Sequence, residues 1–104
     1  MNKTRVDFTS LEWEESAAGV RSKSIVQNGK KLRLVEFTGE FVEHEWCVKG
    51  HIGYVLEGEL EISFGASAER FLAGYGIFIS GGEQERHKAR AISPSVRLIL
   101  VEEA

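Results

Sequence analysis

The chain has 104 residues, of which 13 are basic and 16 acidic, so its formal net charge is −3. Its single cysteine excludes an internal disulfide and a zinc site built from cysteines alone. The mixed charge argues against nucleic acid and against anionic membrane surfaces, and we expect neither as a partner. A hydrophobic fraction of 42% with 28% charged residues is typical of one globular domain.

The N-terminal residues do not resemble an export signal, because no apolar segment follows the basic Lys3 and Arg5. No apolar run approaches the ~20 residues that a membrane-spanning helix needs. Together with the single thiol, these features predict a cytoplasmic protein that does not cross a membrane.

The first expected element is a short helix from Ser10 to Ala18. Ser10 is a suitable N-cap, and acidic residues follow it at Glu12, Glu14 and Glu15. The next signal is Asn28-Gly29, which lies between two apolar segments and predicts a two-residue hairpin turn.

From residue 31 onward the pattern is that of strands. In residues 31–37, Leu32 and Leu34 lie on one face and Arg33 on the other. Further short runs of this kind are punctuated by turn residues. These runs are residues 54–56, 60–64, 70–72, 77–79 and 96–101, with turns at Glu57-Gly58 and at Pro94. About ten short strands in a chain of this length predict an all-β barrel or sandwich.

Two segments resemble the sequence motifs of the cupin superfamily. The first motif extends from Gly50 to Leu60, and its string Tyr-Val-Leu-Glu-Gly-Glu is the most specific part. The second extends from Gly74 to His87, with Gly74 and Gly82 at the motif's glycine positions. The resemblance implies an all-β cupin jelly-roll β-barrel with an internal pocket, and a homodimer. We expect one cupin domain over residues 1–104, with the motif-bearing barrel over about 30–101 and an N-terminal strand or arm over 1–29.

In cupins the two motifs usually supply three histidines and a glutamate to a metal ion. Anchored on Gly58, the motif's glutamate position falls on His51, and the histidine position of the second motif falls on Glu85. The two earlier histidine positions have two alternative registers. They fall either on His44 and Trp46 or on Glu45 and Cys47.

The residues themselves suggest a related ligand set. Glu85 and His87 are two residues apart on a strand-like segment, so their side chains share a face, and the cupin fold would bring His51 alongside. Two imidazoles and one carboxylate with open positions suit a divalent metal such as Fe, Mn, Zn or Ni. His44 is the candidate fourth ligand. Because the imidazoles must be neutral, metal occupancy is expected to fall below about pH 6.

Three further residues are candidates to line a cofactor or ligand pocket, namely Trp46, Cys47 and Tyr54. Cys47 precedes His51 by four residues and is compatible with a soft metal ligand, a nucleophile or a small buried residue. No acidic residue that would orient a Cys–His pair is evident in the sequence, which argues against a papain-like site.

Two functions from different classes fit these observations. One is a metal-dependent cupin enzyme, dioxygenase- or isomerase-like, that acts on a small molecule. The alternative is a metal-free sensor or accessory protein that binds a small organic ligand, which the departures from the metal motif favour. A purely structural homodimer is a third interpretation, in which the segment from Thr4 to Phe8 would pair with a partner subunit.

Overall fold

The computed structural model describes residues 4–104, which form nine β-strands and two single-turn 3-10 helices. In chain order the elements are η1 (Phe8–Ser10), β1 (Glu14–Ala17), β2 (Val20–Gln27), β3 (Lys30–Thr38), β4 (His51–Glu57), β5 (Glu59–Ser63), β6 (Ala68–Leu72), β7 (Gly76–Ile79), η2 (Glu83–Glu85), β8 (Lys88–Ala91) and β9 (Ser95–Glu103). Among these residues no helix is long and apolar enough to cross a membrane.

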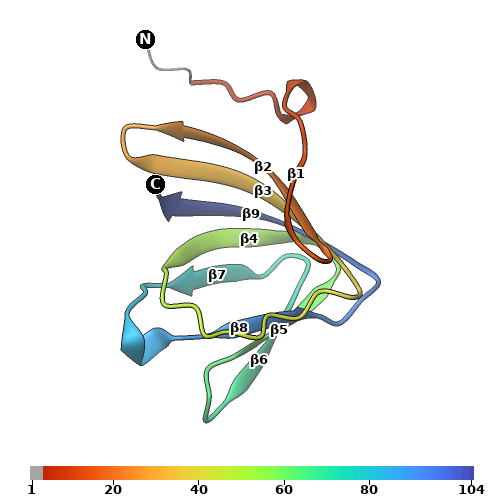
Figure 1. The fold of residues 1–104 in the computed structure, drawn as a ribbon, viewed down its shortest axis with the longest axis vertical. Helices are drawn as coiled ribbons and strands as arrows, with labels where there is room; N and C mark the ends of the chain where they lie inside the picture. Colours follow the sequence, from red (N-terminus) through yellow and green to blue (C-terminus); the bar gives the residue numbers. More distant parts are fainter. Residues whose placement is uncertain (1–3) are drawn as a thin grey trace.

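The strands form two antiparallel sheets that enclose one core. The larger sheet has the strand order β1-β2-β3-β9-β4-β7, and the smaller has the order β6-β5-β8. Figure 1 shows the larger sheet curving from β2 at the top to β7, with the smaller sheet beneath it. Because strands distant in sequence pair with one another, as β3 does with β9, the arrangement is a jelly-roll. The expected all-β architecture is confirmed.

Alternation along the strands decides which side chains face the core. In β9, Val96, Leu98 and Leu100 are buried, and in β3, Val35 and Phe37 are buried. The side chains of β3 at odd positions therefore point inward, including that of Arg33. Leu32 and Leu34 consequently lie on the outer face of the larger sheet.

Two of the expected turns are confirmed by their backbone angles. Asn28 and Gly29 both have positive φ, 52° and 75°, and Gln27 pairs with Lys30 across them, as a two-residue hairpin requires. Gly58 has φ 83°, and a Cβ atom at this position would lie 2.1 Å from the carbonyl oxygen of Ser95. Only glycine therefore fits between β4 and β5.

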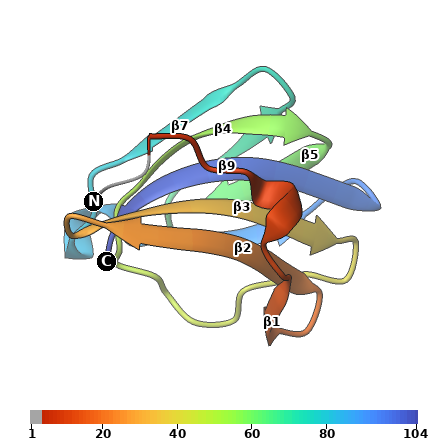
Figure 2. The ribbon, with the colours of Figure 1, turned by 90° about the horizontal axis from the view of Figure 1, so that it is seen from above.

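The helix expected from Ser10 to Ala18 is wrong. The chain instead makes the single turn η1, where the Asp7 carboxylate accepts a hydrogen bond from the Thr9 amide at 3.0 Å, and then enters β1. A helix would have buried no apolar stripe, because the glutamates of this segment are exposed. As a strand, the segment pairs with β2. Residues 4–7 belong to no strand, and Figure 2 shows this N-terminal segment crossing over the larger sheet.

Candidate metal centre

Three side chains that can bind a metal ion converge at one end of the barrel interior. Cys47 lies in the segment between β3 and β4, His51 is the first residue of β4, and His87 directly precedes β8. One ligand atom from each lies within 4.8 Å of the other two. An isolated β-bridge fixes two of them, because the Cys47 amide donates to the His87 carbonyl at 2.8 Å and the His87 amide donates back at 2.9 Å.

The imidazole of His87 is held in one tautomer. Its Nδ1 lies 2.9 Å from the carbonyl oxygen of Glu85, and a carbonyl can only accept, so Nδ1 carries the hydrogen. In the neutral ring Nε2 is then an acceptor. Nε2 has no hydrogen-bond partner among the described residues, although only 2% of the residue is exposed. A buried acceptor without a partner is costly, and a metal ion would satisfy it.

His51 lies against a carboxylate and a thiol. Its Nδ1 lies 2.5 Å from Oε2 of Glu102, and its Nε2 lies 3.8 Å from Sγ of Cys47. The Glu102 carboxylate in turn accepts two hydrogen bonds from Arg33, both at 2.9 Å. The Nε2 atom of His51 is therefore directed toward the thiol. The edge of one imidazole meets the face of the other, with ring centroids 5.1 Å apart for His51 and His87.

Glu102 is a residue of this site that the sequence analysis did not identify, and it provides an acidic partner for the histidine of the Cys–His pair. The alternation of β9 could have revealed it, because the buried positions Val96, Leu98 and Leu100 continue to 102. Burial acts to raise the pKa of Glu102. The hydrogen bonds from His51 and Arg33 outweigh that effect and lower this pKa to about 2. The carboxylate is thus a permanent anion at neutral pH.

Two of the expected metal ligands lie outside the cluster. The Glu85 carboxylate accepts a hydrogen bond from the Ser80 amide at 2.6 Å, and so closes the loop between β7 and β8. Gly81, Gly82 and η2 form this loop, and β8 begins only at Lys88. His87, rather than Glu85, is therefore the residue that lies in the interior. His44 is exposed on the segment that precedes Cys47.

The three candidate pocket residues do not lie together: only Cys47 belongs to the cluster. Cys47 joins the cluster, which agrees with the register that places Glu45 and Cys47 at the two histidine positions. Trp46 points to the surface, where its ring lies 4.9 Å from the Arg86 guanidinium and 4.6 Å from the Lys88 ammonium group. Tyr54 is 47% exposed and lies on the outer face of the larger sheet, because its neighbour Val55 points inward.

The donor set determines which chemistry the site can support. One sulfur and two imidazole nitrogens would supply three protein ligands, the number that catalytic zinc sites use. A thiolate favours zinc or copper over manganese, which prefers oxygen ligands. The grouped donors are thus one sulfur and two imidazole nitrogens, which differ from the expected set of two histidines and one carboxylate.

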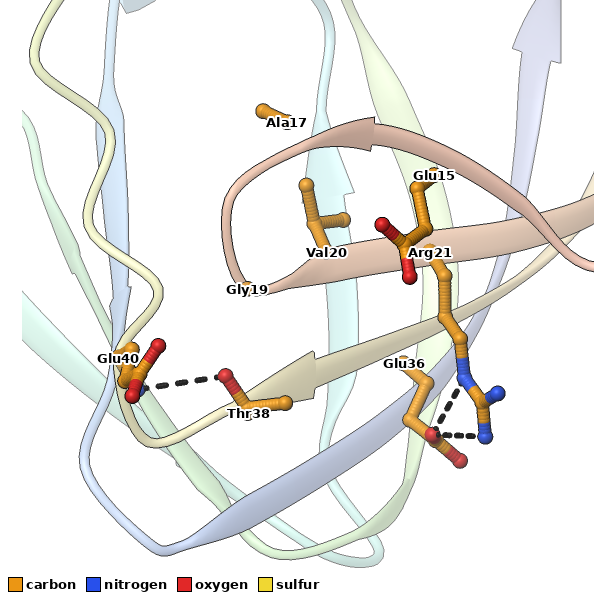
Figure 3. Close-up of a pocket in the computed structure, with 8 residues that line it drawn as sticks. All are labelled: Glu15, Ala17, Gly19, Val20, Arg21, Glu36, Thr38 and Glu40. Carbon is orange, nitrogen blue, oxygen red and sulfur yellow. Dashed lines mark hydrogen bonds and ion pairs between the residues drawn. The ribbon is translucent and has the colours of Figure 1, made fainter.

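A surface hollow lies away from this cluster. It measures about 150 Å³ and lies beside the turn between β1 and β2, as Figure 3 shows. Its wall includes the ion pair between Arg21 and Glu36, whose closest atoms are 2.6 Å apart. None of the cluster residues lines it, so the chemistry and this hollow are separate features.

Comparison with known proteins identifies the fold. No protein-family model and no curated protein matches the sequence. The solved structure of KdgF from Halomonas sp. is similar, with a TM-score of 0.79 and 20% identity over 99% of this chain and 96% of that one. The polyketide cyclase RemF from Streptomyces resistomycificus gives a TM-score of 0.77 and 21% identity over 98% and 80%.

A third similar structure is a cupin-2 domain protein from Shewanella frigidimarina, with 28% identity and a TM-score of 0.64 over 80% of this chain and 79% of that one. The architecture is thus that of a jelly-roll barrel. The chain has the cupin fold, so the fold implied by its two motifs is confirmed.

Proposed function

We propose that this protein binds a divalent metal ion through Cys47, His51 and His87 and presents it to a small organic ligand inside the barrel. The observation that carries the proposal is the buried, unpartnered Nε2 of His87, which faces a thiol and a second imidazole. Zinc is the first candidate, because the soft thiolate replaces the carboxylate of the expected ligand set. Bound there, the metal would act as a Lewis acid on the ligand.

The remaining residues of the site have defined parts in this proposal. Cys47 supplies a charged ligand, so metal binding releases its proton. The Glu85 carbonyl keeps the hydrogen of His87 on Nδ1, so its Nε2 is free to bind, and the Glu102 carboxylate 2.5 Å from His51 Nδ1 would favour the same tautomer of His51. Whether this site belongs to a dioxygenase- or isomerase-like enzyme depends on the ligand, because one cupin barrel hosts many reactions.

Metal analysis tests the proposal directly. The purified protein is stripped with a chelator, dialysed against zinc, and measured by elemental analysis and thermal denaturation. We expect one zinc per chain and a higher Tm in the wild type, and neither in Cys47→Ala or His51→Ala. The exposed histidine variant His44→Ala is the matched control and should behave like the wild type. Substoichiometric metal in the wild type would overturn the proposal.

The alternative function is that of a metal-free sensor or accessory cupin. It is favoured by the 3.8 Å contact between Cys47 Sγ and His51 Nε2, which partly satisfies both groups without a metal. In that case a chelator would leave the Tm of freshly purified protein unchanged, while a small polar molecule would raise it.

We also propose a cytoplasmic location and a homodimer without nucleic-acid partners. The single thiol and the net charge of −3 support the first and last of these.

A further inference from the structure

Three side chains of this site also form the arrangement that activates a nucleophile. The thiol of Cys47 lies 3.8 Å from Nε2 of His51, and Nδ1 of the same ring lies 2.5 Å from Oε2 of Glu102. Two hydrogen bonds from Arg33, both at 2.9 Å, hold that carboxylate in place. A nucleophile beside a base that a third group orients is typical of a reactive cysteine. This arrangement is complete without a metal ion.

The Glu102 carboxylate favours the tautomer of His51 that can remove the hydrogen of the thiol. With its hydrogen on Nδ1, facing Glu102, the ring presents the lone pair of Nε2 to Sγ of Cys47. When the ring takes up the thiol hydrogen, it becomes a cation that the neighbouring carboxylate stabilises. Proton transfer from Cys47 to His51 consequently leaves each new charge beside an opposite one.

His87 adds a buried acceptor that has no donor. The Glu85 carbonyl holds the hydrogen of this ring on Nδ1, so Nε2 is the nitrogen available to a ligand. Only 2% of His87 is exposed, and within residues 4–104 its Nε2 has no hydrogen-bond partner. A ring nitrogen of His87 lies within 4.8 Å of Sγ of Cys47. An oxygen atom bonded to the sulfur fits this separation and can donate its hydrogen to Nε2.

The burial of the cluster selects a small, uncharged reactant. His87 is almost completely buried, the side chain of His51 is 16% exposed, and Cys47 is half-buried. The charges of Glu102 and Arg33 are already paired with each other, so they do not attract a charged substrate. Hydrogen peroxide is small and uncharged, it has a hydrogen to donate, and it is a direct oxidant of accessible thiolates.

We propose that the metal-free protein reacts with hydrogen peroxide at Cys47, with His51 as the general base and His87 as the acceptor that holds the oxidant. His51 removes the thiol hydrogen while the sulfur attacks one peroxide oxygen. The S–O bond forms as the O–O bond breaks, and the departing hydroxide takes the proton from His51 and leaves as water. The sulfur is thereby oxidised to a sulfenic acid and the peroxide is reduced.

Oxidation and metal binding exclude one another, because both use the sulfur of Cys47. The thiolate is the form that binds a metal, whereas the sulfenic acid carries an oxygen on the same sulfur. A bound metal ion would in turn shield the sulfur from peroxide. This competition rests on the proposed function, while the reaction of the metal-free thiol does not depend on it.

The rate of sulfenic acid formation tests the proposal. Protein stripped of metal with a chelator is mixed with hydrogen peroxide, and dimedone traps the sulfenic acid for mass spectrometry. Dimedone does not react with a sulfoxide at Met1, the one methionine of the chain. The wild-type chain unfolded in urea is the reference, because it has the same thiol without its neighbours. We expect the folded chain to react at least about 10-fold faster, since a general base contributes about 100-fold and burial offsets part of that gain. Cys47→Ser should give no adduct.

Variants of the neighbouring residues separate the base from the scaffold. His51→Gln should lower the rate about 100-fold. Glu102→Gln should also lower the rate, and Glu102→Asp, which restores the charge, should recover part of the loss. His44→Ala is the matched control, because His44 is exposed outside the cluster, and it should react like the wild type. Circular dichroism establishes that each variant is folded.

Two results would overturn the proposal. One is a folded wild type that reacts no faster than the unfolded chain, and the other is a folded His51→Gln variant that reacts at the wild-type rate. One equivalent of zinc should abolish the labelling of the wild type. If zinc does not bind while the folded thiol stays reactive, the proposed function is wrong and the peroxide reaction stands. If zinc binds and the metal-free thiol is no faster than the unfolded one, the reverse holds.

Discussion

Glu102→Gln tests the charge of the buried carboxylate, because it replaces the carboxylate with an uncharged amide of nearly the same shape. In the wild type this group contacts both His51 and Arg33, and its side chain is 9% exposed. Glutamine keeps the volume of the side chain but removes its negative charge, which faces the Arg33 guanidinium and Nδ1 of His51. It also brings a donor that can reverse the tautomer of His51, which would place a hydrogen on the metal-facing nitrogen.

The size of the effect follows from the pKa of Glu102. Because the folded protein lowers this pKa from 4.5 to about 2, ionisation stabilises the folded state. At about 1.4 kcal/mol per pKa unit, the contribution is at most about 3.5 kcal/mol at neutral pH. It is complete above the unfolded-state pKa and fades as the pH falls toward about 2. The difference between wild type and variant should shrink over the same pH range.

Urea denaturation between neutral and acidic pH measures the stability, and zinc competition against a chromophoric chelator measures the affinity. We expect Glu102→Gln to lose about 1–3 kcal/mol at neutral pH and 10–100-fold in zinc affinity. Glu103→Gln is the control, because Glu103 is the neighbouring residue but is 79% exposed. Equal behaviour of the two variants in both assays would refute the reasoning, and so would a loss that does not depend on pH.

Three further predictions follow from single residues. His87→Leu should abolish the zinc-dependent rise in Tm, because it removes the buried Nε2 that would bind the metal. Gly58→Ala should cost about 3 kcal/mol or more, whereas Gly29→Ala should cost about 1 kcal/mol, because only at Gly58 would a Cβ atom meet backbone. Hydrogen bonds from Arg97 outweigh burial and lower the pKa of Glu36, so Glu36→Gln should cost about 1 kcal/mol at neutral pH, a loss that vanishes as acid protonates the wild type. Thermal denaturation with and without zinc measures the first and chemical denaturation the other two, and midpoints that match the wild type would contradict them.

The fold was predictable because its signals are local. The turn at Asn28-Gly29, the glycine between β4 and β5, and the apolar alternation of β9 each depend on a few neighbouring residues. The strand β1 was not predictable in the same way, because its glutamates suit the start of a helix, while its pairing depends on β2, which follows it in the hairpin.

The candidate site was less predictable, because its geometry depends on pairings between distant strands. His51 and Glu102 come together only because β4 pairs with β9, with Ile52 opposite Val101. Whether Glu85 or His87 enters the interior depends on the loop that η2 shapes, which residue spacing alone does not fix. The outward position of Tyr54 was open to prediction, since it alternates with the inward His51 and Val55 along one strand.

The paired backbone hydrogen bonds between Cys47 and His87 carry one more consequence. They tie together two segments separated by forty positions, so the thiol and the imidazole are brought into place when the barrel closes and not when a ligand arrives. The entropy of ordering this part of the site is therefore spent during folding. Spectra of a cobalt ion bound there would report the folded population of the whole domain, and the ion would dissociate in the same cooperative transition that unfolds the chain.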